Sequence, residues 1–284
     1  MKKVLVTGGA GFIGSNLINE LLKMGYNVTS IDDYSRGSSI NHLANVNYIN
    51  ICISEISTIN EKFDICFHLA AKTLVSQSFE HVENYFRVNV LGTQCVVDWA
   101  SKNNTKLIYA GSASRHNDVH SSPYALTKYL GEEICRLYKV NFNLSLNIAR
   151  FYNVYGPRET VDEVNGNVIG IWRSQVKKNK PLTIVGDGNQ TRDFIHVKDI
   201  SKGLIKIAES NLSNEDAWEL GSGFQYSINK LFTLFKNRFP EIQKKMMPDQ
   251  PGNFKESIRV NDHMIKKLNW KPEDRLEDYI LTIK

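Results

Sequence analysis

The sequence predicts an α/β fold in which helices cover both faces of a doubly wound parallel sheet, with a smaller C-terminal lobe. The apolar run Val4–Val6 leads into a glycine-rich turn and a helix-periodic segment, and a second apolar run ends at Asp32. Further apolar runs of strand length alternate with helix-periodic segments through the first half of the chain. This alternation is typical of parallel sheets, whose strands are buried on both faces.

The first strand, turn and helix carry a dinucleotide-binding pattern. Gly8, Gly11 and Gly14 are spaced for a tight turn that lets a pyrophosphate approach the backbone at a helix N-terminus. Asp32 follows about 20 residues later, where an acid accepts hydrogen bonds from an adenosine ribose. Its charge repels a 2′-phosphate, which favours NAD over NADP, although Arg36 could hold such a phosphate. The pattern therefore predicts a bound NAD.

The other elements follow in order from periodicity and turn signals. Apolar spacing and a following Gly25 predict a helix over 13–24. A cap at Ser122 and Pro123 at the first turn predict another helix start. The expected strands are 26–31, 46–53, 63–71, 105–110, 144–151, 181–185 and 217–221, the last a candidate to return to the main sheet. The further expected helices are 83–101, 171–178, 199–209 and 229–239.

After Pro157 the sequence becomes polar and is interrupted by glycines, which suggests that the chain has two parts. Residues 1–157 are expected to form the NAD-binding Rossmann domain, joined by the returning strand near 217–221. Residues 158–284 are expected to form mainly a substrate-binding lobe over the carboxyl edge of that sheet. At 284 residues the chain is long enough for this arrangement.

Composition excludes several classes of protein. Lys and Arg number 35 against 30 Asp and Glu, and the excess is spread along the chain, which argues against nucleic-acid binding. No apolar run approaches the ~20 residues of a membrane span, and no signal peptide precedes the first strand, so we expect a cytoplasmic protein. The four cysteines lack C-x-x-C spacing, which predicts reduced thiols and no metal site. His68, within an apolar strand, is expected to be a hydrogen-bonded core residue.

Three residues are suited to hydride-transfer chemistry. Tyr124 and Lys128 lie one helical turn apart in the predicted helix, and Ser112 ends the preceding strand at the same sheet edge. A tyrosine has an ordinary pKa of about 10, and an ammonium ~4–6 Å away contributes roughly 3–4 kcal/mol toward the phenolate. We therefore expect Tyr124 as base, Lys128 as electrostatic partner and ribose anchor, and Ser112 as orienting hydroxyl.

Together these motifs resemble the extended short-chain dehydrogenase/reductases, and within them the NAD-dependent nucleotide-sugar epimerases and dehydratases. The resemblance covers nearly the whole chain, and within the family the sequence is similar to the UDP-glucose 4-epimerases. Its carriers are the segments 7–14, Asp32 before 35–37, 68–71, 89–93, 123–128, 150–157 and 186–197.

The resemblance implies the following sites. The cofactor site would comprise Gly8, Gly11, Phe12, Ile13, Gly14, Asp32, Asp33, Leu69, Ala70, Ala71, Asn89, Tyr124, Lys128 and Phe151. A nucleotide-sugar substrate would contact Ser112, Asn153, Thr183, Arg192 and Arg259, with Asn153 and Arg192 on its diphosphate and Thr183 near its nucleoside. The family also implies a homodimer through helices 83–101 and 124–139.

Departures from the family pattern narrow the reaction. Dehydratases carry an acid after the Ser or Thr, where this chain has Ala113 and Ser114. The usual Val-Tyr-Gly is replaced by residues 115–117, Cys52 stands where relatives have an acid, and Gln250 where many have an arginine. We therefore expect a 4-epimerase that oxidises sugar C4 to a 4-keto intermediate and returns the hydride. The alternatives are a nucleotide-sugar dehydrogenase or ketoreductase with exchangeable NAD(H), and a catalytically silent NAD-binding scaffold.

Overall fold

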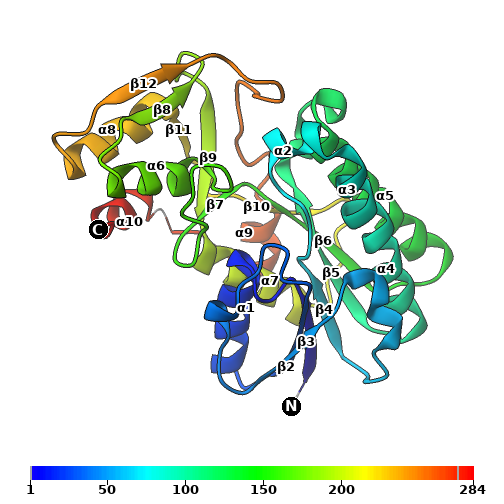
Figure 1. The fold of residues 1–284 in the computed structure, drawn as a ribbon. Coiled ribbons are helices and arrows are strands. Elements are labelled where there is room, and N and C mark those ends of the chain that lie inside the picture. Colours follow the sequence, from blue (N-terminus) through cyan, green and yellow to red (C-terminus); the bar gives the residue numbers. More distant parts are fainter. Residues whose placement is uncertain (1, 274) are drawn as a thin grey trace.

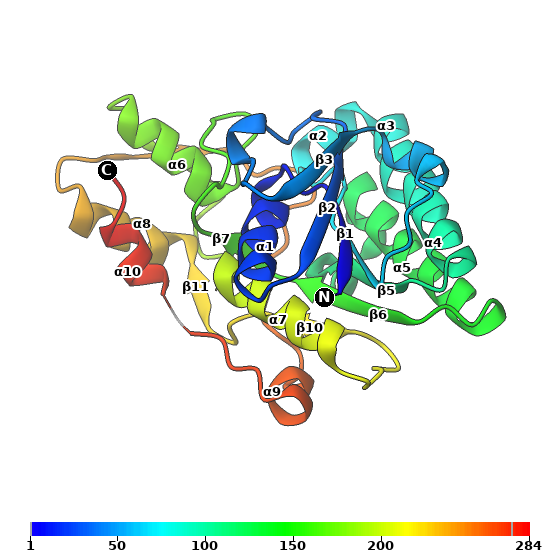
Figure 2. The ribbon, with the colours of Figure 1, turned by 90° about the horizontal axis from the view of Figure 1, so that it is seen from below.

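A computed structural model describes residues 2–273 and 275–284. Its largest feature is a seven-stranded sheet that is parallel throughout, with helices on both faces, as expected (Figures 1 and 2). From one edge to the other the strands are β10 (Trp218–Leu220), β6 (Leu146–Phe151), β5 (Lys106–Ser112), β4 (Ile65–His68), β1 (Lys3–Thr7), β2 (Asn27–Asp32) and β3 (Val46–Asn50). The predicted fold class and the predicted return of the strand near 217–221 are both confirmed.

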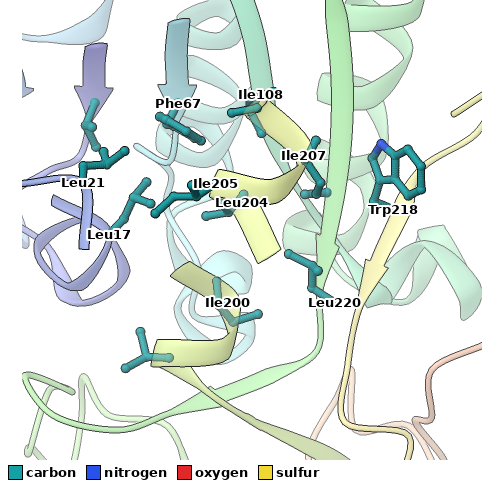
Figure 3. Close-up of a cluster of buried hydrophobic side chains, with 14 of the residues drawn as sticks. Leu17, Leu21, Phe67, Ile108, Ile200, Leu204, Ile205, Ile207, Trp218 and Leu220 are labelled. Atoms are coloured by element: carbon teal, nitrogen blue, oxygen red, sulfur yellow. The ribbon is translucent and has the colours of Figure 1, made fainter. Parts of the chain in front are cut away.

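The alternation of side chains along β1 divides the core into two layers. Val4 and Val6 pack with α1 (Phe12–Lys23) and α7 (Val197–Glu209), and Figure 3 shows Leu17, Leu204 and their neighbours closing this layer. Leu5 faces the other side, where it packs with α4 (Thr93–Lys102). The helix α5 (Pro123–Asn141) covers the same face beside α4. Helices therefore shield both faces of the sheet from solvent, which is why its strands are predominantly apolar.

The helix expected over 83–101 is present, but its hydrogen-bond pattern changes in the middle. The chain runs through α2 (Val75–Glu80) and α3 (Val82–Phe86), then a π-helical segment Arg87–Gly92, before α4 begins. Within the π-helical segment the buried side chain of Asn89 bonds both backbone groups of Lys72, accepting from its N–H at 2.8 Å and donating to its C=O at 2.9 Å. Such segments often occur at functional sites. Here it places an amide group behind the loop that follows β4.

The smaller lobe has its own apolar core around Trp172 and Phe235. It contains two small sheets and three main helices, drawn green to red around one end of the large sheet in Figure 1. The strands are β7 (Asn153–Tyr155), β9 (Thr191–His196) and β11 (Gln225–Ser227) in one sheet, and β8 (Leu182–Val185) with β12 (Lys244–Met247) in the other. The helices are α6 (Val168–Lys177), α8 (Ile228–Arg238) and α10 (Leu276–Leu281), while α9 (His263–Leu268) packs against β10.

Candidate active site

A continuous cavity of about 610 Å³ lies at the carboxyl ends of the parallel strands. It includes the point where the strand order reverses beside β1, the position at which open α/β sheets bind ligands. Residues of both the large sheet and the smaller lobe line it. The predicted residues that line this cavity are Gly8, Gly11, Phe12, Ile13, Gly14, Asp32, Asp33, Leu69, Ala70, Ala71, Ser112, Tyr124, Lys128, Phe151, Asn153, Thr183 and Arg192.

The glycine turn forms a groove at one end of the cavity, and its backbone is packed too closely for side chains at two of its positions. A Cβ atom on Gly14 would lie 2.2 Å from the carbonyl oxygen of Gly8. Gly8 has φ +72°, and a Cβ there would lie 2.9 Å from the backbone of Ala70. The groove leads into the N-terminus of α1, where backbone N–H groups favour an anion. These residues therefore fit a pyrophosphate.

The carboxylate of Asp32 is held at the end of β2. It accepts hydrogen bonds from the backbone N–H groups of Ala10, at 3.0 Å, and Tyr34, at 2.9 Å. Burial raises the pKa of Asp32, and the two N–H groups oppose that rise. Its position beside the glycine turn fits recognition of a ribose by hydrogen bonds.

The first turn of α5 brings the candidate base to the strand end. The hydroxyl of Ser122 caps the helix by accepting from the N–H of Ala125 at 3.1 Å. Tyr124 then projects toward β5 and donates its hydroxyl hydrogen to Oγ of Ser112 at 3.2 Å. Ser112 and Tyr124 are thus brought together as expected, from positions 12 residues apart.

Lys128 is on the same helix, but its ammonium is directed elsewhere. Its Nζ donates to the carbonyl of Ala110 at 2.5 Å and lies 4.5 Å from the centre of the Tyr109 ring. Burial lowers the pKa of Lys128 to about 8, and Glu132 opposes that shift. Burial likewise raises the pKa of Tyr124, and only its hydrogen bond with Ser112 opposes that rise. Lys128 was expected to lower the pKa of Tyr124. In the protein chain without bound ligands it does not.

The wall of the cavity that the smaller lobe forms contains a partly enclosed cation. Arg192 donates to the carbonyl oxygens of Thr191 and Phe254 and to Oδ1 of Asn253, at 2.8–2.9 Å. All three acceptors are neutral, and burial lowers the pKa of Arg192 to about 10. A cation that is desolvated among neutral groups is suited to binding an anionic ligand.

The other two predicted contacts on this side already have protein partners. Nδ2 of Asn153 donates to the carbonyl of Asp193 at 3.2 Å. The hydroxyl of Thr183 accepts from Nε2 of Gln175 at 3.0 Å. Both residues nevertheless line the cavity together with Arg192. The hydroxyl of Thr183 and the second amide hydrogen of Asn153 can still donate to a ligand.

Two predicted site residues do not line the cavity. Asn89 is behind it, with its amide bonded to Lys72 and to Thr127. Arg259 donates to the carbonyl of Gly221 at 2.8 Å and pairs with Asp262 at 2.6 Å. The guanidinium of Arg259 is therefore occupied by protein groups rather than directed toward a ligand.

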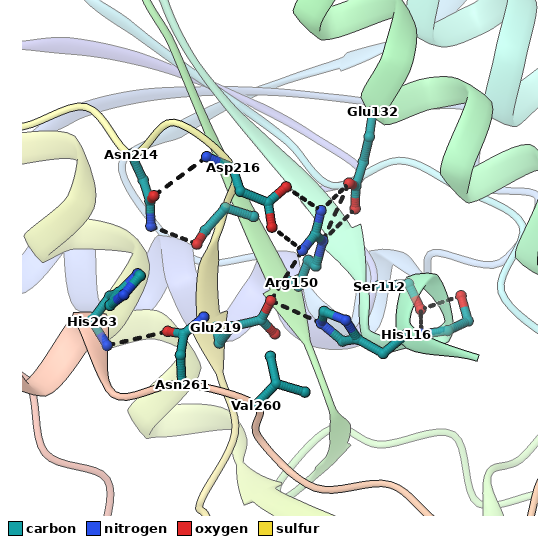
Figure 4. A network of polar contacts seen from close by, with 12 residues as sticks. Ser112, His116, Glu132, Arg150, Asn214, Asp216, Glu219, Val260, Asn261 and His263 are labelled. Carbon is teal, nitrogen blue, oxygen red and sulfur yellow. Dashed lines mark hydrogen bonds and ion pairs between the residues drawn. The ribbon is translucent and has the colours of Figure 1, made fainter.

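A charged network behind the strand ends was not foreseen (Figure 4). Arg150 on β6 is 1% exposed and pairs with Glu132 of α5, at 2.7 Å, and with Glu219 of β10, at 3.1 Å. Burial opposes the charge of Arg150, but the hydrogen bonds from Arg150 to Glu132 and Asp216, together with the charges of Glu132 and Glu219, outweigh it and raise the pKa of Arg150. A glutamate inside the apolar run 217–220 was the one available sequence signal, since unpaired acids are rarely buried.

Other predictions about individual residues can be compared directly. His68 is buried between Thr7, at 2.8 Å, and Thr93, at 3.1 Å, and burial lowers its pKa to about 3, which confirms a hydrogen-bonded core histidine. All four cysteines are free thiols. Within residues 2–273 and 275–284 no cluster of His, Cys, Asp or Glu is arranged to hold a metal ion. None of the helices in these ranges combines the length and hydropathy needed to cross a bilayer.

Comparison with known proteins places this geometry in a family. Residues 4–221 match the model of the NAD-dependent epimerase/dehydratase family. A Methanocaldococcus jannaschii protein named "Putative UDP-glucose 4-epimerase" is 32% identical over 99% of this chain and 96% of its own length. A UDP-N-acetyl-alpha-D-glucosaminuronate decarboxylase of Bacillus cytotoxicus is also 32% identical, over 81% of this chain and 78% of its own.

A solved structure extends the likeness to the whole fold. It is a Bacillus cereus UDP-glucuronic acid 4-epimerase variant in complex with UDP-4-deoxy-4-fluoro-glucuronic acid and NAD. That structure matches with a TM-score of 0.91 at 27% identity, over 99% of this chain and 97% of the other.

Proposed function

Because this chain belongs to the NAD-dependent epimerase/dehydratase family, we propose that it is a nucleotide-sugar 4-epimerase whose cofactor is NAD. The observation that carries the proposal is the pairing of the Tyr124 and Ser112 hydroxyls, 3.2 Å apart, in a cavity that also contains the glycine turn and Arg192. One wall fits a dinucleotide and the other fits an anionic sugar nucleotide. The reacting hydroxyls lie where the two ligands would meet.

The chain's own residues divide the work. The glycine turn, Asp32 and Lys128 would hold the cofactor, and bound NAD⁺ supplies the reversible hydride acceptor. Tyr124 takes the proton of the sugar 4-hydroxyl when C4 is oxidised and returns it when C4 is reduced from the opposite face. Ser112 donates its hydroxyl hydrogen to the sugar oxygen and so fixes the orientation of the C4 carbon.

The substrate class follows from the charges on the other wall. Arg192 supplies a desolvated cation for the diphosphate, and Asn153 lies beside it in the wall. Thr183 lies farther along, near the expected nucleoside. The relatives reported above are named for UDP-sugars and the solved structure contains one, which supports a UDP-sugar as the substrate.

The sequence after Ser112 favours epimerisation over elimination of water. Ala113 and Ser114 occupy the positions at which a dehydratase would place an acid, and neither side chain can donate a carboxylic proton. A nucleotide-sugar dehydrogenase or ketoreductase with exchangeable NAD(H) is the second candidate, since the same three residues serve a single hydride transfer. The intact Ser112–Tyr124 pair argues against a silent scaffold.

An NMR assay separates these reactions. The purified protein is incubated separately with UDP-glucose, UDP-N-acetylglucosamine and UDP-glucuronic acid, and the anomeric proton signals are followed. We expect one or more of these sugars to equilibrate with its 4-epimer without net formation of NADH. Stoichiometric accumulation of NADH would instead identify a dehydrogenase, and release of CO₂ from the glucuronic acid a decarboxylase.

Assembly and location are also part of the proposal. Leu91, Leu137 and Val140 are exposed on the π-helical segment and α5, which supports a homodimer through these helices. Light scattering of the wild type and of Leu137→Glu would test it, since a charge there should yield monomers. The free thiols support a cytoplasmic location. We propose that residues 1–157 bind mainly NAD and that residues 158–284 bind mainly the nucleotide sugar.

A further inference from the structure

The turn after Ser112 is tied to the edge strand of the large sheet. Ser112 ends β5, and a single 3₁₀ turn, Ala113–His116, follows it. At the end of this turn Nε2 of His116 lies 2.9 Å from Oε1 of Glu219 on β10. Because a carboxylate only accepts hydrogen bonds, Nε2 carries the proton and donates it. Figure 4 shows His116 directed toward Glu219, and His116 is not among the residues that line the cavity.

Glu219 connects this turn, through Arg150, to the helix α5. Its side chain is 0% exposed and accepts from three donors: His116, Nη1 of Arg150 at 3.1 Å and the hydroxyl of Tyr152 at 2.9 Å. Arg150 in turn donates to both carboxylate oxygens of Glu132. Glu132 lies on α5, two turns after Tyr124.

These contacts form a closed circuit. It starts at Ser112, passes through the turn to His116, and continues through Glu219, Arg150 and Glu132 to α5. The circuit closes where Tyr124 of α5 donates to Ser112 at 3.2 Å. Ser112, Glu132, Arg150 and Glu219 are buried, whereas 28% of the His116 side chain is exposed. His116 is therefore the one link that can be removed without emptying the interior.

We propose that His116 is a positioning residue: through Glu219 it fixes the turn after Ser112, and so sets the distance between the hydroxyls of Ser112 and Tyr124. The inference rests on the proposed function, in which these two hydroxyls act on the same sugar oxygen. Positioning of reacting groups is sensitive to small displacements, because a shift of about 1 Å can cost roughly 100-fold in rate. Loss of one exposed tether allows a smaller shift, so we expect a loss of roughly 10-fold.

Three variants test the role of His116. His116→Ala removes the donor, and His116→Gln keeps an N–H donor of similar reach. His120→Ala is the matched control, because this exposed histidine of the same loop has no side-chain hydrogen bond to any described residue and does not line the cavity. The fold should survive in each case, since Glu219 keeps Arg150 and Tyr152 as donors.

Two independent readouts are measured. For any UDP-sugar that the wild type epimerises, His116→Ala should lower kcat roughly 10-fold with KM within about twofold, while His116→Gln and His120→Ala stay within about threefold of wild type. Bound NAD, measured by mass after denaturation, should be unchanged in all variants. In crystal structures, the Ser112–Tyr124 contact should persist in the wild type and His116→Gln and open beyond hydrogen-bond distance in His116→Ala.

The outcomes separate the two proposals. Wild-type protein that turns over none of the three UDP-sugars refutes the proposed function, and the crystallographic distance alone then decides the role of His116. An intact Ser112–Tyr124 contact in His116→Ala overturns the positioning role, as does an unchanged kcat. A fall in activity of His116→Gln equal to that of His116→Ala also overturns it, because the donor would then not be the relevant property.

Discussion

Replacement of Arg192 by Met tests the substrate chemistry most directly. Arg192 is partly enclosed in the wall of the cavity, and its three hydrogen-bond acceptors are neutral. If this cation binds a diphosphate, Arg192→Met should weaken the binding of UDP without changing the binding of uridine. Methionine keeps most of the side-chain volume, so the wall should retain its shape.

The magnitude follows from the loss of charge-assisted hydrogen bonds. Each such bond is worth about 1.5–3 kcal/mol, so loss of one weakens UDP binding roughly 10- to 150-fold. The stability of the fold should change little. Burial lowers the pKa of Arg192 from 12.5 to about 10, which corresponds to a cost on the order of 3 kcal/mol for enclosing the charge. The three hydrogen bonds that the guanidinium donates to protein oxygens oppose this cost.

Calorimetric titration with UDP and with uridine provides the assay. Arg238→Met is the matched control, because Arg238 packs on the ring of Phe239 in the same lobe and does not line the cavity. The control should bind UDP like the wild type. Equal losses of UDP and uridine affinity in Arg192→Met would refute the reasoning, as would wild-type UDP binding, because the cation would then not contact the phosphates.

Three further predictions concern the cofactor side of the cavity. Tyr124→Phe should lower turnover of a nucleotide sugar by roughly 100- to 10,000-fold while bound NAD, measured by mass, is unchanged; loss of NAD would show a structural role instead. In NAD-free protein, Lys128→Met should raise Tm at pH 7, because burial lowers the pKa of Lys128 from 10.5 to about 8 and the enclosed ammonium destabilises the fold. This gain should shrink from pH 8 to 10.5, where the native lysine is already neutral and the unfolded one still charged, and a gain independent of pH would contradict the cause. Arg36 donates a 2.8 Å hydrogen bond to the carbonyl of Asn165, which joins the loop after β2 to the smaller lobe. Arg36→Ala removes this bond and should therefore release NAD roughly 2- to 10-fold faster in a dilution assay. An unchanged rate would show that this hydrogen bond does not retain the cofactor.

Local patterns predicted the glycine turn, the strands and the start of α5. The glycine turn and Asp32 depend on spacing within one βα unit, and the burial of the strands follows from their continuous apolar runs. The same is true of the start of α5, since a cap and a proline define it. These features are encoded by residues that are close in the sequence, which is why no knowledge of distant contacts was needed.

Features that depend on distant partners were missed or misplaced. Glu219 is compatible with burial only because His116, Arg150 and Tyr152 reach it from separate elements, and periodicity carries no information on such contacts. Arg259 was expected at a ligand, but its guanidinium donates to the carbonyl of Gly221, a partner on a separate segment that the local sequence does not reveal. The π-helical segment at Asn89 likewise depends on the backbone of Lys72, 17 residues earlier.

The electrostatics of Tyr124 show how far the chain alone can prepare the reaction. A helical turn placed Lys128 where its charge could favour the phenolate, but the carbonyl of Ala110 and the Tyr109 ring hold the ammonium instead. Burial then dominates, and it raises the pKa of Tyr124 while lowering that of Lys128. With a pKa of about 8, Lys128 is still mostly cationic at neutral pH, so both groups are held in their protonated forms. A proton acceptor at Tyr124 therefore requires positive charge from a bound ligand, or release of Lys128 from Ala110. If Tyr124 is the base, as proposed, it would therefore accept a proton only once the cavity is filled.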